Sequence, residues 1–446
     1  MNSSEVVAKV RRRESSIEEI TREALGLVDT AEGFGAITWR NDERALSDAR
    51  DADQRLSFGA ATRPLEGVPF TVKELLAVEG EVWDQGSAAF AGLKAPATSR
   101  IVDRLRAAGA ILVAGTASAE FGALPTTENV RGACRNPNDP SRTSGGSSGG
   151  AAVCAWLGIP LDHGSDGGGS IRIPAACTGV VGLKPTRGRV SAGPLSGDGW
   201  GGLSVNGVLA PRVDDAAGFL DAVAGPAKDD PSMAPPPRRR FLFAAADRKP
   251  RRIGVAITRD GIGVEPSAER ATRLAADTLA DAGHDVFDVE LNLDELEEGF
   301  GILSQVGIGA TPIPADAADQ LLPRVRHIWE AAQQVTGREV MRALEGTAIR
   351  SRRVLEAFAR FDALLTPTLS GPAPMLGELG ADPDRAWEDY RVFLQWTWPF
   401  NATGQPAITI PFGEVGGLPL GVQFVGHKGD EWSLLALGAE LEDLRS

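Results

Sequence analysis

Apolar residues recur at every third or fourth position in two early segments, which is the spacing of one helix face. The first segment opens with the capping-box sequence Ser16-Ile17-Glu18-Glu19, which predicts that a helix begins there. The second segment stops at Gly109, and glycine commonly ends a helix. The apolar positions are Ile17, Ile20 and Ala24 in the first segment and Ile101, Val102, Leu105 and Ala108 in the second.

Shorter apolar runs predict strands beside these helices. Apolar residues alternate with others between Val68 and Val72 and predict a strand that ends at Lys73. The continuous apolar run 110–114 follows the second helix directly and predicts a buried strand. Helices that alternate with strands over short connections indicate an α/β layered fold.

The second half of the chain carries another strand–helix–strand pattern. Arg252–Ile257 and Val286–Leu291 are strand-like, and Pro266–Ala282 between them is helical, which predicts a βαβ unit. Residues 225–251 are rich in proline and charged residues and predict an exposed linker. This linker either separates two domains or interrupts one extended sheet.

The composition is that of a soluble globular protein. Of the 446 residues, 42% are hydrophobic and 24% are charged, and the formal net charge is −14. Because nucleic-acid binding needs a basic surface, this charge argues against a nucleic-acid partner. The basic runs Arg11–Arg13 and Arg238–Arg240 are short and are interpreted as solvated surface.

Cysteine usage and apolar run lengths bear on the compartment. The 3 cysteines are odd in number and fit no metal-binding spacing, so a reducing cytoplasm suits them best. The N-terminal sequence has no apolar stretch typical of a secretory signal. The longest apolar run, roughly residues 151–161, is too short to span a bilayer. We therefore expect a cytoplasmic protein with no membrane partner, and we leave a homodimer open.

Two clusters of glycine and serine interrupt the α/β pattern. The first, SGGSSGG, covers residues 144–150, and the second, GSDGGGS, covers residues 164–170. Both predict turns rather than strands. The apolar segment 151–157 between them predicts a short buried helix.

Four interpretations compete for the first cluster. A flexible linker is rarely followed at once by an apolar helix, a P-loop would need a Gly-Lys-Ser/Thr ending, and a dinucleotide-binding loop would need a preceding strand. Residues 145–149 also match G-x-S-x-G, the nucleophile elbow of α/β-hydrolases. That elbow needs a histidine late in the chain, where only His427 is available.

A serine nucleophile without a histidine needs another base. A lysine can serve only when it is neutral, which requires desolvation or nearby positive charge to lower its pKa. Lys73 ends an apolar strand and precedes the apolar stretch 75–78, so it is a candidate for this base. The alternative is a surface charge, the usual role of a single lysine.

The second cluster has the composition of an oxyanion hole or of a tight turn. Successive glycines let backbone N–H groups converge on a developing negative oxygen without obstruction by side chains. Ser170 closes the run and is placed to attack from beside such a pocket.

Together, these segments resemble the amidase-signature family, which includes fatty acid amide hydrolase, malonamidase and the amidotransferase subunit that makes glutaminyl-tRNA. The match is dense over residues 62–213 and returns over 361–426, and paired serine clusters in this order are a specific signal. The matching segments are Val72-Lys73, Ala107–Ala110, Asn136-Pro137, Gly145–Gly150, Gly164–Pro174, Gly182–Thr186, Leu365–Thr368, Asn401–Ala407 and Gly417–Pro419.

The resemblance implies a fold. It is an α/β fold in which a mixed, twisted sheet is covered by helices on both faces. It forms a single large domain over residues 1–446, with a variable excursion on the substrate side at about 225–350.

The resemblance also implies a role for each site residue. Ser170 is the nucleophile, and Ser147, which follows a cis peptide bond, bridges it to Lys73. The neighbouring residues have supporting roles: backbone N–H groups of Gly167, Gly168, Gly169 and Ser170 hold the oxyanion, Asp166 and Arg172 pair to brace the loop, and Ser148 positions the bridge.

The implied reaction is acyl transfer through a covalent intermediate. Lys73 accepts a proton from Ser147, Ser147 accepts one from Ser170, and Ser170 attacks the carbonyl of a small-molecule amide. No metal or cofactor takes part. Two alternatives stay open, an amide-forming acyltransferase and a catalytically silent binding subunit.

The chain departs from the family pattern at three places. Glu74 stands where an aspartate usually follows the lysine, and Ala114-Gly115-Thr116 replaces the more usual Gly-Lys-Thr. The two serines Ser147 and Ser170 are 23 positions apart, one fewer than is common. These departures concern helix register and pocket shape, while all three triad residue types remain.

The substrate is less clearly indicated than the chemistry. Glutaminase-type members carry an acidic residue where this chain has Leu394 and Gln395, so an apolar or aromatic amide is favoured over free glutamine. Trp83 and Trp200 are candidates for the pocket lining or for the core. Residues 164–175 also resemble the hydrolases that act on cyclic nylon dimers and related lactams.

Overall fold

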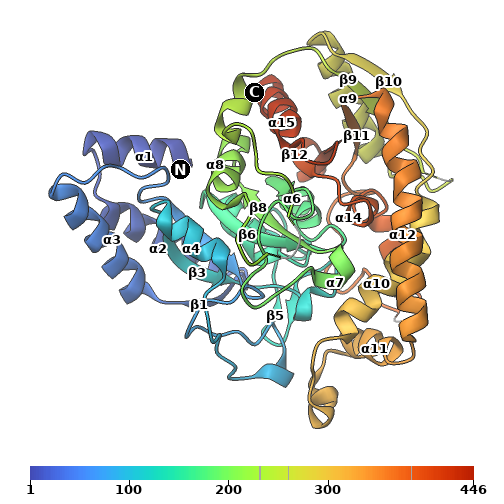
Figure 1. Cartoon of the computed structure of the whole chain (residues 1–446), viewed down its shortest axis with the longest axis horizontal. Coiled ribbons are helices and arrows are strands. Elements are labelled where there is room, and N and C mark those ends of the chain that lie inside the picture. Colours follow the sequence, from blue (N-terminus) through green and yellow to red (C-terminus); the bar gives the residue numbers. More distant parts are fainter. Residues whose placement is uncertain (231–232, 260, 383, 446) are drawn as a thin grey trace.

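A mixed sheet of 11 strands runs through the whole molecule (Figure 1). The computed structural model describes residues 1–230, 233–259, 261–382 and 384–445. The strand order across the sheet is β1 (Ile37–Arg40), β3 (Ile111–Thr116), β2 (Pro69–Lys73), β6 (Leu161–Asp166), β8 (Val205–Ala210), β7 (Val181–Lys184), β12 (Ala407–Val415), β13 (Leu418–Gly426), β11 (Ala363–Pro367), β9 (Arg252–Val255) and β10 (Asp285–Asp288). A separate two-stranded ribbon joins β4 (Glu128–Asn129) to β5 (Gly132–Ala133).

Parallel pairing occurs at two places in the sheet. Strand β2 is parallel to both β3 and β6, and β9 is parallel to both β10 and β11. The other neighbouring strands are antiparallel. The predicted α/β class with one mixed sheet is therefore confirmed, and the sheet continues across the two parts of the chain that the 225–251 segment joins.

Helices cover both faces of the sheet. Helices α5 and α6 pack together on one face, while α8, α9 and α15 pack on the other. The helices are α1 (Ser3–Arg12), α2 (Ile17–Glu32), α3 (Asp42–Ser57), α4 (Arg100–Ala107), α5 (Gly149–Leu157), α6 (Arg172–Thr178), α7 (Gly199–Gly202), α8 (Val213–Val223), α9 (Pro266–Asp281), α10 (Glu297–Gly309), α11 (Pro323–Ala332), α12 (Gly337–Ala357), α13 (Ala386–Phe393), α14 (Pro399–Ala402) and α15 (Glu431–Arg445).

Local sequence signals account for several of these elements. The Ser16 side chain caps α2 and the Glu19 side chain reaches back to it, so the predicted capping box is present. Strand β2 is buried at every position and ends at Lys73, as predicted. Gly109 follows α4 with a φ of +102°, a conformation that glycine adopts without strain. The βαβ prediction is also confirmed, because β9 and β10 are parallel neighbours joined by α9.

One prediction about the second glycine cluster is wrong in part. The turn predicted over residues 164–170 begins later, because residues 164–166 form the end of β6 and pair with β8. Antiparallel pairing with β8 satisfies the backbone groups that a glycine-rich turn would leave to solvent. The site loop is consequently held by a strand on one side and by α6 on the other.

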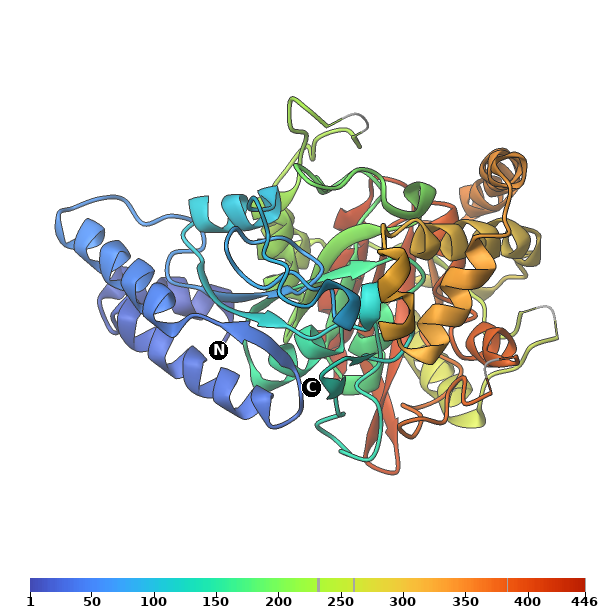
Figure 2. The same ribbon diagram turned by 90° about the horizontal axis from the view of Figure 1, so that it is seen from below.

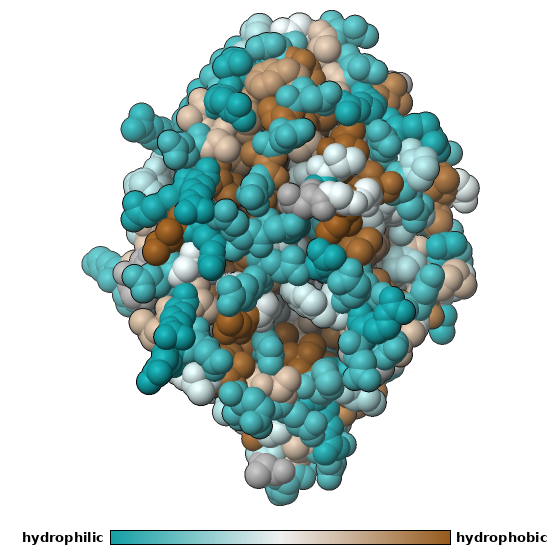
Figure 3. Space-filling model, turned by 90° about the vertical axis from the view of Figure 1, so that its right-hand side faces the viewer, coloured by the Kyte–Doolittle hydropathy of each residue, from teal (hydrophilic) through white to brown (hydrophobic). Residues whose placement is uncertain are grey.

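Helices α10, α11 and α12 form a layer beyond the sheet, at the right of Figure 1 and in the orange part of Figure 2. Helix α10 packs against both α11 and α12. The face that carries these helices is largely hydrophilic, with hydrophobic side chains in recesses between polar ones (Figure 3). No helix among the described residues is long and apolar enough to cross a membrane.

Candidate active site

Lys73 lies at the carboxyl end of β2, inside the sheet. Its side chain is fully buried. Its Nζ donates hydrogen bonds to Ser147 Oγ at 2.7 Å and to Ser165 Oγ at 3.0 Å. The amine therefore contacts two hydroxyl groups, one from each glycine–serine cluster.

Burial gives this amine an unusual protonation equilibrium. Desolvation lowers the pKa of Lys73 from 10.5 to about 7, against the opposing effect of the negative charges of Asp166 and Glu74. Neutral and charged forms of the amine are therefore both populated near pH 7. A lysine in this state can accept a proton and return it.

Ser147 enters the site through a cis peptide bond that follows Gly146. Gly146 lies so close to the Thr126 backbone that a Cβ at this position would overlap it, which explains the glycine. The next residue, Ser148, is the N-cap residue of α5 and donates its hydroxyl to the Ser165 carbonyl at 3.3 Å. Ser148 thus joins the two segments whose hydroxyls surround the lysine.

A buried ion pair braces the turn between β6 and α6. Arg172 Nε and Nη2 donate to the two carboxylate oxygens of Asp166 at 2.9 Å, and both side chains are fully buried. Burial alone would raise the pKa of Asp166, but the charge and hydrogen bonds of Arg172 lower it to about 2. The remaining Arg172 hydrogen bonds go to the Thr397 carbonyl, Gln423 Oε1 and Asn401 Oδ1.

The same carboxylate engages one of the predicted oxyanion donors. The Gly169 N–H donates to Asp166 Oδ1 at 2.8 Å, so the structure corrects the prediction that this group is free to hold an oxyanion. A buried carboxylate needs several hydrogen-bond donors. At a φ of +136°, Gly169 brings its N–H within reach of the Asp166 carboxylate. In the described part of the chain, no protein hydrogen bond from the N–H of Gly167, Gly168 or Ser170 is recorded.

Ser170 lies at the wall of a cavity of about 790 Å³. Its side chain is 8% exposed. Among the described residues, no hydrogen bond joins Ser170 Oγ to Ser147. The structure thus places Lys73 directly on Ser147 and places Ser170 at the adjoining cavity.

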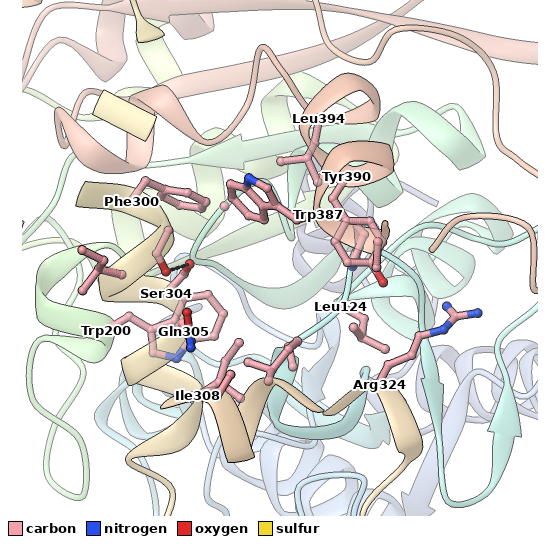
Figure 4. A pocket seen from close by; sticks show the side chains of 18 of the residues that line it. Leu124, Trp200, Phe300, Ser304, Gln305, Ile308, Arg324, Trp387, Tyr390 and Leu394 are labelled. Atoms are coloured by element: carbon pink, nitrogen blue, oxygen red, sulfur yellow. Dashed lines mark hydrogen bonds between the residues drawn. The ribbon is translucent and has the colours of Figure 1, made fainter. Parts of the chain in front are cut away.

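The cavity is lined mainly by apolar and aromatic side chains (Figure 4). Most of them come from α10, α11 and α13. The Phe300 ring lies 4.9 Å from the Trp398 ring and 6.2 Å from the exposed Trp387 ring. The main apolar lining residues are Leu124, Trp200, Phe300, Ile308, Trp387 and Leu394.

Comparison with known proteins identifies the family. The family model described as Amidase matches residues 19–435. The chain belongs to the amidase family. It is an amide-hydrolysing enzyme of the amidase-signature type, as predicted.

Individual amidase relatives align over most of their length. The chain is 36% identical over 422 residues to AmiB2 of Mycobacterium tuberculosis, and the alignment covers 90% of this chain and 87% of that protein. It is 35% identical over 420 residues to the 6-aminohexanoate-cyclic-dimer hydrolase of Paenarthrobacter ureafaciens, covering 86% and 84%. A structure of 6-aminohexanoate cyclic dimer hydrolase complexed with substrate matches with a TM-score of 0.91 and 30% identity, covering 100% and 97%.

In this amidase, Glu74 is held away from the lysine by its own partners. The buried Glu74 carboxylate accepts from the Ser118 N–H at 2.7 Å and from Asn129 Nδ2 at 3.2 Å, and it forms an ion pair with Arg131. Burial raises the pKa of Glu74 while Arg131 opposes that rise. The glutamate that replaces the more usual aspartate is therefore held by its own hydrogen bonds and ion pair. The Lys73 amine contacts the two serines instead.

Ser165 is the site residue that the sequence analysis missed. It was assigned to a turn, although it lies near the end of β6, beside the parallel strand β2. Neighbouring parallel strands bring their carboxyl ends to one edge of a sheet, so a strand prediction at 161–166 would have placed Ser165 near Lys73.

The other site expectations have mixed outcomes. Trp200 lines the cavity, whereas Trp83 is not among the lining residues and donates its indole N–H to the Leu75 carbonyl. Leu394 lines the cavity as well. The nucleophile-elbow alternative loses its base, because His427 Nε2 contacts the Phe361 carbonyl at 2.9 Å.

Proposed function

We propose that this amidase hydrolyses a small apolar or aromatic amide through an acyl-enzyme on Ser170, with Ser147 as the relay and Lys73 as the base. One observation carries the proposal. A fully buried lysine amine lies 2.7 Å from a serine hydroxyl, beside a cavity that holds a second serine. No other base of suitable pKa contacts Ser147 among the described residues.

The first step activates the nucleophile. Neutral Lys73 takes the proton of Ser147, and Ser147 takes the proton of Ser170 as its oxygen attacks the amide carbonyl. The bond from Ser147 to Ser170 would form in the substrate complex, where catalytic hydrogen bonds commonly tighten. Ser165 acts as a positioning residue, because its hydroxyl fixes the second side of the lysine amine.

Backbone N–H groups then stabilise the tetrahedral oxyanion. We assign this role to the N–H groups of Gly167, Gly168 and Ser170, and we assign the Gly169 N–H to holding the loop on Asp166. The Gly168 carbonyl accepts from Thr397 Oγ1 at 2.7 Å, which fixes the plane of the adjoining peptide group. That peptide group also carries the Gly169 N–H, so the two hydrogen bonds together hold the centre of the loop that carries the proposed oxyanion donors.

Collapse of the intermediate returns the proton along the same path. Protonated Lys73 donates through Ser147 to the departing nitrogen, the C–N bond breaks, and an ester links the acyl group to Ser170. A water activated by the same relay then hydrolyses the ester. The residues alone supply this chemistry, so we propose no metal or cofactor.

The cavity suggests the substrate class. Its apolar and aromatic lining favours an alkyl or aryl acyl group, since burying such surface is favourable by about 25 cal/mol per Å². We propose that the segments 62–213 and 361–426 supply the chemistry and that the excursion at about 225–350 supplies the part of the substrate wall formed by α10 and α11. The relative from Paenarthrobacter ureafaciens, a cyclic-dimer hydrolase by its name, supports a lactam as one such amide.

Two measurements test this proposal. A fluorophosphonate probe should label wild type and a Ser141→Ala control, whose serine is exposed and outside the site, but should not label Ser170→Ala. A panel of aryl, alkyl and amino-acid amides should show hydrolysis by wild type and none by Ser170→Ala. Labelling that survives in Ser170→Ala and is lost only in Ser147→Ala would overturn the assignment. Added hydroxylamine separates hydrolysis from acyl transfer, because an acyltransferase would form the hydroxamate in preference to the acid.

A further inference from the structure

Two polar side chains of the cavity wall, Arg324 and Tyr390, have no part in the proposed amide chemistry. Arg324 lies in the first turn of α11 and Tyr390 lies on α13, and both line the cavity that holds Ser170. Figure 4 shows the Tyr390 hydroxyl and the Arg324 guanidinium on the same side of the pocket, close to Leu124. They form a polar end in a wall that is otherwise largely apolar.

Tyr390 carries a buried hydroxyl whose O–H has no acceptor recorded among the described residues. The residue is 8% exposed, and the neighbouring Arg324, which can only donate, leaves the hydroxyl proton without an acceptor. Burial raises the pKa of Tyr390, and the charge and hydrogen bond of the neighbouring Arg324 oppose this without reversing it. The phenol is therefore a neutral donor at ordinary pH, and leaving such a donor unpaired in a buried place is costly.

Arg324 is a cation without a counter-ion. One N–H of its Nη1 donates to the Leu379 carbonyl at 2.9 Å, and no carboxylate among the described residues forms an ion pair with it. Glu128 and Asp389 act on the pKa of Tyr390 from nearby, but neither bonds to its hydroxyl. Most of the guanidinium donors thus remain available to a ligand.

The carboxylates of the same wall behave differently. Three of them form ion pairs with arginines that are not among the cavity-lining residues, and one more, Asp384, has no recorded ion pair among the described residues. The paired carboxylates are Asp294 with Arg259 at 2.5 Å, Glu298 with Arg350 at 3.6 Å and Glu297 with Arg391 at 3.8 Å. Arg324 is therefore the cavity-lining arginine whose charge the wall does not neutralise.

We propose that Arg324 and Tyr390 form a subsite for a carboxylate at the end of the substrate remote from the scissile amide. A guanidinium offers two parallel donors to a carboxylate, and the phenol adds a third from the side. The apolar wall between this subsite and Ser170 suits a methylene chain. The inference rests on the proposed function and narrows it to the monoamides of dicarboxylic acids.

Matched substrate pairs test the subsite. Adipic acid monoamide and hexanamide share a six-carbon acyl chain, but the first ends in a carboxylate and the second in a methyl group. Pairs with shorter and longer chains test other distances between the amide and the carboxylate. We expect wild type to prefer one carboxylate-bearing member by at least about tenfold in kcat/KM. Arg324→Gln should remove this preference, so that the two members of the pair are hydrolysed with similar kcat/KM. Tyr390→Phe should reduce it in part.

Arg326→Gln is the matched control. Arg326 lies on the same helix, pairs with Asp319 and Glu330, and is not among the cavity-lining residues. Its substitution should leave the selectivity unchanged. Equal rates for both members of every pair, or a preference for the cationic 6-aminohexanamide, would overturn the subsite while leaving the amidase chemistry intact.

Binding to an inactive variant separates this inference from the proposed function. In Ser170→Ala protein, calorimetry should show the preferred acid monoamide binding at least about tenfold more tightly than its neutral partner, and Arg324→Gln in that background should abolish the difference. Failure of wild type to hydrolyse any amide in the panel would overturn the proposed function. Equal binding of acid and neutral partners in Ser170→Ala would overturn the subsite, whatever the turnover measurements show.

Discussion

The two sides of the cavity differ in the kind of interaction that holds their side chains in place. On one side, Lys73, Ser147 and Ser165 are joined by short hydrogen bonds, and the Asp166–Arg172 ion pair braces the loop behind them. On the other side, α10, α11 and α13 present mainly apolar and aromatic side chains, with single polar groups such as Ser304 and Gln305 among them. The first side is a network of specific donors and acceptors, and the second is a packed surface.

This difference predicts which substitutions should lower the reaction rate and which should change substrate selectivity. A hydrogen-bonded network fails when one member is removed, because the remaining polar groups are left buried and unpaired. An apolar wall tolerates change in proportion to the area or volume lost. We therefore expect large effects on kcat from the polar side and smaller effects on KM from the helical side.

The largest expected effect is the loss of the nucleophile. Ser170→Ala should lower kcat by about 10⁴-fold or more, as removal of a catalytic serine does in other serine hydrolases. The melting temperature should stay within about 2 °C of wild type, because no hydrogen bond of Ser170 Oγ is recorded among the described residues. Residual activity above one per cent would remove Ser170 from the mechanism.

The base should give the next largest effect, together with a diagnostic pH profile. The pKa of Lys73 is lowered from 10.5 to about 7 by burial, so the neutral, proton-accepting form grows as pH rises through 7. We expect kcat/KM in the free enzyme to increase about tenfold per unit below pH 7 and to level off above it. Lys73→Met should lower kcat by about 10³-fold and remove the rise of kcat/KM with pH.

A contradictory profile is easily recognised. Activity that is constant from pH 5 to pH 9, or that falls as pH rises through 7, would mean that the lysine is not the base. Ser165→Ala offers a finer test, because it removes one of the two hydroxyls at the amine and keeps Lys73 itself. If Ser165 positions the amine, its loss should shift the pH at which kcat/KM levels off and should also lower kcat.

The polar side was also the easier part to predict from the sequence. A serine nucleophile without a histidine needs another base, and Lys73 was a candidate because an apolar strand ends at it, while the family resemblance implied its role. Ser165 escaped because glycines around it indicated a turn, whereas pairing with β8 holds residues 164–166 as a strand. The Gly169 N–H was misassigned for a related reason, since its bond to Asp166 depends on a loop geometry that residue types do not reveal.

The helical side was largely hidden from sequence analysis. Helix α10 contains four glycines, at positions 299, 301, 307 and 309, and glycine lowers helix propensity by about 1 kcal/mol relative to alanine. Helix α12 begins with a capping box formed by Thr336 and Glu339, a signal that was present but unused. Even a correct helix prediction would not reveal that Arg324 and Tyr390 meet, because that depends on how separate helices pack.

Breaking the brace should affect stability more than any single wall substitution. Arg172→Met would leave the Asp166 carboxylate buried without its cation and would remove five hydrogen bonds. We expect the free energy of unfolding to fall by about 3–5 kcal/mol. Arg326→Met, which breaks only exposed ion pairs, should change it by less than about 1 kcal/mol. Denaturant unfolding of both variants measures the difference, and similar small losses would refute the bracing role.

The smallest expected effect tests the wall itself. Phe300 lies over Gly168, so that a Cβ on Gly168 would come within 2.9 Å of its ring, and it also packs on Trp398. Phe300→Ala removes apolar contact area close to Gly168 and leaves the hydrogen bonds of Lys73 to Ser147 and Ser165 in place. We expect KM for an aryl amide to rise about tenfold, the cost of losing roughly 1.5 kcal/mol of apolar contact, with kcat within about threefold of wild type.

The comparison within this experiment decides what the wall contributes. An acetyl amide is too small to use the Phe300 surface, so its KM should hardly change, and the ratio between the two substrates reports the lost contact. Phe243→Ala serves as the control, because that ring is 62% exposed and is not among the cavity-lining residues. If Phe300→Ala instead lowered kcat for both substrates by a hundredfold, the ring would be positioning the oxyanion loop through Gly168. The wall and the polar side would then have to be treated as one coupled unit.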